Sequence, residues 1–203
     1  MKIIALFFFT ILFFQSAFSQ DSLQMQYKYG FEDKEVNSLL LFQNIDIETI
    51  TFTGKNLIGK FYEVAVKEYK KGKLIKRSVL MDTEVSDYLK NEDSTTTLKF
   101  FTKIDKGEIT VFGSSPKFYS AKKVYKIKKS QFENFLQKRL ESSEDFVNVP
   151  INVEFPLFVI FTPYLKEDGT GAYCEVTQSN IQTEQYWKEY KIPHYFIITM
   201  KFK

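Results

Sequence analysis

Residues 61–81 carry the pattern that most constrains the fold, because two strand-like apolar segments flank a short lysine-rich turn that contains a glycine. This arrangement predicts a β-hairpin closed by a two-residue loop. Directly opposite side chains of such a hairpin share one face, and we expect the apolar face to be buried. A Lys71-Gly72 loop gives a register that pairs Lys70 with Lys73, Val64 with Val79 and Tyr62 with Met81.

The rest of the chain continues as short apolar segments separated by turn residues. A second hairpin is predicted over residues 96–112 with a turn at 105–107, and a strand over residues 118–127 extends it after the 113–116 turn. Residues 157–161 are apolar at every position, which is typical of a central strand covered on both faces. Further strands are expected at residues 39–42, 45–52, 172–176 (after a turn at 167–171) and 194–202.

Two segments predict helices instead. Ser130 and Glu133 form a capping box, in which the two side chains satisfy otherwise unpaired backbone donors. Apolar residues then recur at helical spacing, so we expect an amphipathic helix over residues 130–140. A second capping box at residues 179–182 opens a shorter helix that ends before Pro193.

This order of elements predicts the α+β class, with a mainly antiparallel sheet built as a meander of hairpins and one or two short amphipathic helices packed on it. The 203-residue length suits one domain, which we place at residues 20–203, with residues 20–38 as a loose polar arm. Aromatic residues make up 17% of the chain, and such residues favour sheets. Because the sequence holds one cysteine, no intramolecular disulfide can form, and packing alone must stabilise the fold.

Residues 1–19 are typical of a secretory signal peptide. A single lysine precedes an apolar run over residues 3–14, and the small residues Ala17 and Ser19 predict cleavage between Ser19 and Gln20. A membrane-spanning helix needs about 20 apolar residues, and this run is well short of that. No cysteine follows the run to carry a lipid. We therefore expect an exported bacterial protein, periplasmic or secreted, that is soluble and neither membrane-spanning after cleavage nor a lipoprotein.

The scarce side chains that could carry chemistry lie late in the chain. The single cysteine, Cys174, and the single histidine, His194, are the candidate catalytic pair, since a thiolate nucleophile needs a neighbouring imidazole base. Neither lies in a motif typical of cysteine hydrolases, so a buried thiol and a structural histidine are the competing interpretation. The candidate binding residues in the same part of the chain are Tyr164, Glu167, Asp168, Trp187 and Tyr190.

The sequence gives little support to metal or cofactor chemistry. One histidine and one cysteine cannot build the usual structural zinc site. Glu167 and Asp168 beside Gly169 offer oxygen ligands, but the ordered calcium-loop pattern is missing, and a solvated turn is the competing interpretation. No glycine-rich phosphate-binding loop occurs in the sequence. We therefore expect no metal and no cofactor.

Two lysine clusters, at residues 67–77 and 117–129, could attract an acidic partner. Acidic residues elsewhere offset them, and the formal net charge of the whole chain is only +3. Lysines on edge strands also discourage aggregation between sheets. We interpret both clusters as solvated faces, with binding of an acidic protein, lipid headgroups or a polyanion as the alternative.

The many strands and aromatic residues, without a catalytic motif, favour a non-enzymatic exported binding or interaction protein that resembles an inhibitor, an immunity-type partner or a carrier in its role. Its partner would be a protein or an apolar small ligand of the cell envelope, and not a nucleic acid. A carrier would need a cup lined by phenylalanines. The alternative is an exported hydrolase of polysaccharide or peptidoglycan that uses two carboxylates, which spacing along the chain cannot identify.

Overall fold

The computed structural model describes residues 22–127, 136–139, 146–161, 164–165, 171–172, 176 and 181–203, with residues 136–139, 164–165 and 171–172 described by their backbone. The predicted signal peptide and its cleavage site lie outside this part of the chain. Among the described residues, no helix combines the length and the apolar character needed to cross a membrane.

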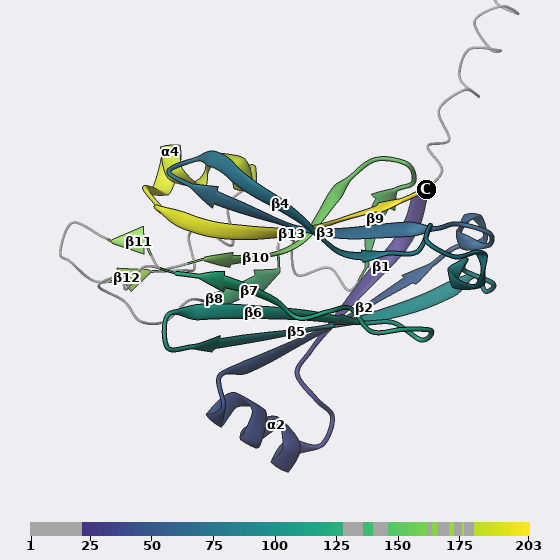
Figure 1. Ribbon diagram of the computed structural model, residues 1–203, viewed down its shortest axis with the longest axis horizontal. Helices are drawn as coiled ribbons and strands as arrows, with labels where there is room; N and C mark the ends of the chain where they lie inside the picture. Colours follow the sequence, from purple (N-terminus) through teal and green to yellow (C-terminus); the bar gives the residue numbers. More distant parts are fainter. Residues whose placement is uncertain are drawn as a thin grey trace, which may run out of the picture.

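The described strands form two antiparallel sheets that lie face to face, and a separate two-stranded ribbon (Figure 1). The six-stranded sheet has the order β7-β6-β5-β2-β1-β9 and consists of β1 (Ser22–Tyr29), β2 (Ile45–Thr53), β5 (Thr95–Asp105), β6 (Glu108–Ser114), β7 (Lys123–Lys126) and β9 (Val147–Pro150). The five-stranded sheet has the order β4-β3-β13-β10-β8 and consists of β3 (Tyr62–Lys70), β4 (Lys73–Asp82), β8 (Leu136–Arg139), β10 (Phe155–Phe161) and β13 (His194–Phe202). The ribbon pairs β11 (Tyr164–Leu165) with β12 (Gly171–Ala172).

The described helices are short and lie outside the two layers (Figure 1). α2 (Lys34–Phe42) connects β1 to β2, and α4 (Tyr186–Tyr190) precedes β13. The described residues also form three 3-10 turns: η2 (Lys55–Leu57), η3 (Asp87–Leu89) and η4 (Thr183–Gln185). Mainly antiparallel sheet with short helices confirms the predicted α+β class.

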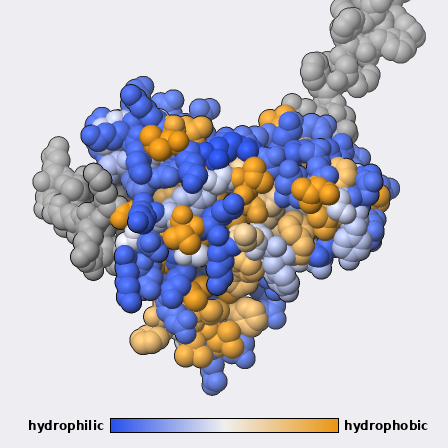
Figure 2. Space-filling view, viewed as in Figure 1, coloured by the Kyte–Doolittle hydropathy of each residue, from blue (hydrophilic) through white to orange (hydrophobic). Residues whose placement is uncertain are grey.

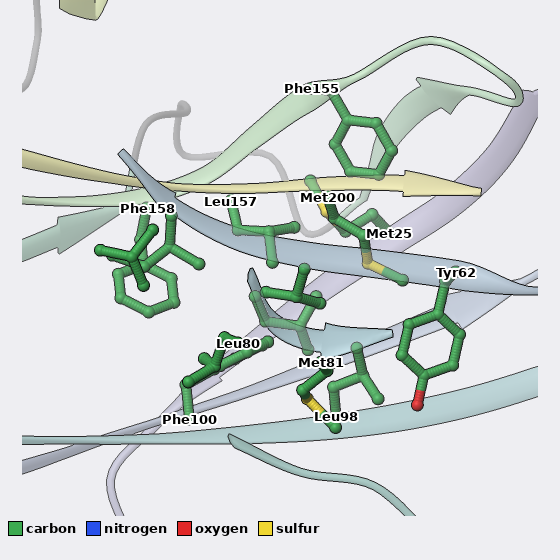
Figure 3. Close-up of a cluster of buried hydrophobic side chains, with 14 of the residues drawn as sticks. Met25, Tyr62, Leu80, Met81, Leu98, Phe100, Phe155, Leu157, Phe158 and Met200 are labelled. Atoms are coloured by element: carbon green, nitrogen blue, oxygen red, sulfur yellow. The ribbon is translucent and has the colours of Figure 1, made fainter. Parts of the chain in front are cut away.

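The main core fills the space between the two sheets. Alternate residues of each strand point inward, so that Phe100 of β5 meets Phe158 of β10 edge to face, with 5.5 Å between ring centroids. Figure 3 shows these two rings near Leu80, Leu98 and Leu157, all of them buried. Because apolar side chains from both sheets interlock, the two layers are stabilised as one packed unit.

A second core lies on the outer side of the five-stranded sheet. Phe161 of β10 and Tyr195 of β13 are buried there under Tyr186 of α4, whose ring centroid is 5.9 Å and 5.7 Å from theirs. The central strands of this sheet are therefore covered on both faces. This confirms the prediction for residues 157–161, where an apolar side chain at every position implied that environment.

The predicted hairpin turns are confirmed. Lys70 pairs with Lys73 across Lys71 and Gly72, whose φ values are 49° and 73°. The turn at residues 106–107 has the same backbone, with φ values of 47° and 83°. Both are two-residue loops with two left-handed residues, the geometry that suits the twist of a hairpin. The 45–52 strand, the C-terminal strand and a short helical segment before Pro193 are also present, as β2, β13 and η4–α4. The third strand is shorter than the predicted 118–127, because only Lys123–Lys126 form β7. No side-chain hydrogen bond caps η4, so the capping box predicted at 179–182 does not start this segment.

The register predicted farther along the first hairpin was wrong. Val64 pairs with Met81, and Val79 pairs with Ala65, because the register shifts once between Glu68 and Tyr69 and again between Val64 and Ala65. Tyr62 does not face Met81 either: its carbonyl accepts a hydrogen bond from the backbone N–H of Thr83 at 3.0 Å. Each bulge adds one residue to β4. As a result Val79 is 40% exposed, whereas Met81 is buried.

The helix predicted over residues 130–140 was wrong where the structure describes it. Residues 136–139 form β8, which pairs antiparallel with β10. The capping box at Ser130 lies outside the described residues. The open edge of β10 offers unpaired backbone groups, and pairing with them outweighs a local helical pattern.

Two predictions near the N-terminus were also wrong. Residues 22–29 are not a loose arm but β1, which lies between β2 and β9 and buries Leu23 and Met25. Residues 39–42 are not a strand but the last turn of α2. The strand predicted over residues 172–176 is present only in part. Residue 172 pairs in β12, but Val176 is helical.

Candidate functional site

His194, one of the two candidate catalytic residues, begins β13 and is bound by its neighbours. Its Nε2 lies 2.9 Å from Oε1 of Glu68, and Nζ of Lys70 lies 2.8 Å from the same oxygen. Its ring also packs on Phe196, with centroids 4.8 Å apart. Burial lowers the pKa of His194, although hydrogen bonding to Glu68 opposes that shift. These contacts suit a structural role, in which His194 fastens the start of β13 to β3.

Cys174 lies outside the described residues, so its pairing with His194 stays a prediction. The same holds for Glu167 and Asp168, and Tyr164 is described only as a backbone position in β11. Within the described part of the chain, no three His, Cys, Asp or Glu side chains gather where they could hold a metal ion.

Trp187 and Tyr190, two candidate binding residues, lie on α4. A Cβ atom placed on Gly72 would lie only 3.2 Å from Cβ of Trp187, so α4 sits directly on the turn of the β3–β4 hairpin. The backbone N–H of Lys71 donates to the carbonyl of Pro193 at 2.8 Å and fixes the same contact. Tyr190 packs against Tyr186, and Tyr190 and Trp187 are both half-buried.

Carboxylates cluster on the outer face of the five-stranded sheet, but cations already occupy them. Glu154 accepts hydrogen bonds from Lys67 at 2.6 Å and from Thr199 at 2.8 Å. Burial would raise the pKa of Glu154, but these hydrogen bonds and the nearby Arg77 lower it. The pKa of Glu63 is lowered as well. Burial would raise it, but hydrogen bonds from Arg77 and Lys203 lower it. A general acid needs a raised pKa, so this cluster suits a structural ion network.

The surface that sequence reasoning missed is α2. This nine-residue helix buries none of its residues. Leu39 is 61% exposed and Phe42 is 86% exposed, and Val36, Leu41 and the preceding Phe31 are exposed as well. Figure 2 shows the resulting hydrophobic area at the end of the molecule where α2 projects in Figure 1. Soluble proteins rarely expose contiguous apolar side chains of this kind, so this surface is a candidate for contact with another molecule.

Specific contacts hold α2 in place despite its exposure. Oδ1 of Asp33 accepts hydrogen bonds from the backbone N–H groups of Glu35 and Val36 at 2.9 and 3.0 Å, which caps the first turn. The side-chain oxygen of Asn37 accepts a hydrogen bond from the backbone of Phe31 at 3.0 Å. A helix this short is marginal in water by itself, so these contacts, and not burial in the core, stabilise its conformation.

A row of aromatic rings continues from α2 across the outer face of the six-stranded sheet. Phe101 lies opposite Ile47 in the ladder between β2 and β5. Its ring is 5.6 Å from that of Phe112, which in turn is 6.0 Å from that of Tyr119. Since α2 contacts β2, this row begins beside the helix and continues away from it. We call α2, Phe31 and this row the apolar surface.

One sequence signal could have revealed α2. Asp33 stands three residues before Val36, and acceptors at that position cap helices. The four consecutive apolar residues at 39–42 suggested a strand instead. Neither a protein-family model, nor a curated protein, nor a solved structure matches this chain.

Proposed function

We propose that this chain is an exported, non-enzymatic binding protein that docks a partner protein through α2. The observation that carries the proposal is a helix with Leu39 and Phe42 on its surface and no buried residue. Helices with an apolar face gain most of their stability by packing that face against another element. Here that element is supplied by the partner.

The energetic argument is simple. Moving a leucine or phenylalanine side chain from water into an apolar environment is worth roughly 1.5–3 kcal/mol. Leu39 and Phe42 are one helical turn apart, so one groove on a partner can receive both. The caps already fix the helix, which reduces the entropy lost on binding. Recognition would follow the helix-in-groove mode.

The charges around α2 favour a protein over a lipid surface. Glu32, Asp33 and Glu35 stand at the start of the helix, and Lys28 forms an ion pair with Glu32. An anionic membrane surface would repel these carboxylates. A protein groove can place matching cations against them, which would add specificity.

The other roles receive less support. A carrier needs an internal cup, but the inward-facing phenylalanines Phe52, Phe100 and Phe158 pack against other rings. A hydrolase needs a carboxylic acid of raised pKa, whereas Glu63 and Glu154 have lowered pKa values. Neither observation concerns the residues outside the described part of the chain.

Site-specific photo-crosslinking in the native host tests the proposal. A photoreactive phenylalanine analogue replaces Phe42, and a matched control carries it at Val85, which is 76% exposed and lies outside the apolar surface. We expect one crosslinked protein adduct from position 42 that is absent from position 85 and disappears with Leu39→Glu. No adduct at position 42, or adducts only with lipid or with a second copy of the chain, would overturn the proposal.

Export has its own test. N-terminal sequencing of the protein recovered from the host envelope and medium should show a mature chain that begins at Gln20. Recovery of the uncleaved chain from the cytoplasm alone would reject export without bearing on α2.

A further inference from the structure

Uncharged polar side chains cover one part of the outer face of the six-stranded sheet. Two rows of residues cross neighbouring strands there, because residues paired in the ladders share a face. The first row runs from β9 to β5, and the second runs from β1 to β5. We call these residues the neutral face: Asn148, Gln24, Thr53 and Thr95 in the first row, and Gln26, Thr51 and Thr97 in the second.

The alternation of burial along each strand shows that both rows point outward. On β1, the buried Leu23 and Met25 alternate with the exposed glutamines. β2, β5 and β9 show the same alternation, and their outward residues in the two rows are exposed or half-buried. Oγ1 of Thr51 lies 2.9 Å from Oγ1 of Thr97, so neighbouring strands present their hydroxyl groups on the same side of the sheet.

The absence of charge distinguishes the neutral face from the outer face of the other sheet. Charged residues make up 26% of the chain, and protein surfaces carry roughly 25–35% of them. No residue of the neutral face is charged. The outer face of the five-stranded sheet instead carries the ion network of Glu63, Lys67, Arg77 and Glu154. A ligand for the neutral face therefore needs no charge of its own.

The neutral face keeps hydrogen-bonding capacity for a ligand. Within the described part of the chain, the side chains of Gln24, Gln26, Thr53 and Thr95 form no hydrogen bond with one another or with other residues. Amide and hydroxyl groups both donate and accept hydrogen bonds. Sugar hydroxyl groups do the same, so a sugar can bond to this face with either role at each position.

One exposed aromatic ring lies beside the neutral face. Phe146 immediately precedes β9 and is 53% exposed. It stands two residues before Asn148, and the intervening Val147 packs against the main core, so Phe146 and Asn148 both point outward. An exposed ring can pack against the C–H groups of a sugar while neighbouring amides bond to its hydroxyl groups.

The spacing of the strands suits an extended chain of sugars. Neighbouring strands lie about 4.7–4.9 Å apart, so each row offers one polar side chain per strand at that interval. The length of one residue in an extended β-1,4-linked sugar chain is close to the same interval. A chain that runs across the strands can therefore place one sugar over each of them.

We propose that the neutral face and Phe146 bind an extended neutral polysaccharide, with the amide and hydroxyl groups bonded to its hydroxyls and the ring packed against one sugar. A protein partner fits this face less well, because protein interfaces concentrate binding energy in aromatic and arginine anchors, among which threonine is rare. This site supplies one ring and no arginine. It shares no residue with the apolar surface and is independent of the partner proposed for α2.

An NMR titration of the isotope-labelled chain measures binding and locates it. The probes are cellohexaose, xylohexaose and mannohexaose, three neutral β-1,4-linked chains. We expect at least one of them to shift the signals of the neutral face, with an affinity that changes less than about twofold between low and moderate salt, because no ion pair forms. The absence of a shift with all three probes would overturn the proposal, as would shifts confined to other surfaces or a steep fall in affinity with salt.

Matched double variants test the glutamines. Gln24→Ala/Gln26→Ala should weaken binding about fivefold or more, since the hydrogen bonds of two amides are lost. Gln182→Ala/Gln185→Ala removes two exposed glutamines from another part of the surface and should change the affinity less than about twofold. Equal losses in the two variants would reject the site.

A second variant removes hydroxyl groups without disturbing the sheet. Thr53→Val/Thr95→Val keeps the β-branched shape that favours strands, so the test holds even if the glutamine variant proves unstable. It should weaken binding about threefold or more, because two hydrogen bonds are lost. An unchanged affinity would remove the first row from the site and overturn the proposal.

A competing ligand tests the preference for an extended chain. Maltohexaose is neutral and of the same length, but its α-linked chain coils and cannot lie across successive strands. It should bind more weakly than the tightest of the three β-linked probes. Equal or tighter binding of maltohexaose would show that the spacing of the rows does not select the ligand, and would overturn the proposal.

Discussion

The two described α-helices of this protein have opposite relations to the core. α4 has five residues and buries Tyr186 against Phe161 and Tyr195. α2 has nine residues, is rich in leucine, and buries none of them. The difference shows that apolar composition does not decide burial. The position of the helix decides burial. α4 lies over apolar side chains of the five-stranded sheet, whereas α2 lies in the connection between β1 and β2 and projects from the molecule (Figure 1).

The comparison separates two uses of apolar residues. On α4 they stabilise the fold by packing, so their loss should reduce the free energy of unfolding. On α2 they contact water, so their loss should leave stability unchanged while abolishing docking. Stability and binding are thus expected to respond to different substitutions.

Tyr186→Ala should give the largest loss of stability. Removing a fully buried aromatic side chain costs about 3–5 kcal/mol, because apolar contacts are lost and a cavity remains. Phe42→Ala, an aromatic truncation on the other helix, should change the free energy of unfolding by less than about 0.5 kcal/mol. Urea unfolding of both variants measures this, and equal effects would abolish the distinction between the helices.

Gly72→Ala should have the next largest effect on the free energy of unfolding, because it disturbs the contact between α4 and the turn of the β3–β4 hairpin. The residue has φ of 73°, and an added Cβ would lie 3.2 Å from Cβ of Trp187. We expect a loss of about 2 kcal/mol. Gly59→Ala is the control: its φ is 78° and nothing lies within 4 Å of the added atom, so backbone strain alone should cost about 1 kcal/mol. A Gly72 variant no worse than the control would show that α4 does not rest on the turn.

Stability should fall as the pH drops below about 6.5, the ordinary pKa of histidine. Burial lowers the pKa of His194 in the folded state, so the unfolded chain binds the proton more tightly. At high pH His194 is neutral in both the folded and the unfolded state, so its protonation does not affect stability. As the pH falls through the unfolded-state pKa towards the lower folded-state pKa, protonation favours the unfolded chain and the free energy of unfolding decreases. Thermal unfolding at pH 7.5 and 5.5 measures it. His194→Gln should flatten this slope, and an unchanged slope would assign it to other groups.

Asp33→Ala should have the smallest effect on global stability, although it removes the cap of α2. The helix itself should lose about 1 kcal/mol, seen as faster exchange of its amide hydrogens. Global unfolding should shift by less than about 0.5 kcal/mol, because the helix buries nothing. A global loss comparable with that of Tyr186→Ala would mean that α2 is part of the core.

Sequence reasoning was most successful where the determinant is local. The turns at Lys71-Gly72 and at residues 105–107 were predicted because each contains a glycine, which readily adopts a left-handed backbone. The bulges of β4 were not predicted, since nothing in residues 73–82 marks an extra residue. Of the candidate site residues, Trp187 and His194 come to the same end of the β3–β4 hairpin, but α2 was absent from the list because its leucines suggested a strand.

The sequence by itself determined the hairpins, the central apolar strand and the α+β class, because alternation of side chains and turn chemistry act between neighbouring residues. Only the tertiary structure decided that residues 22–29 lie inside a sheet, that residues 136–139 pair with β10, and that α2 remains outside the core. Those outcomes depend on backbone hydrogen bonds and burial between distant segments, whose partners no local pattern identifies.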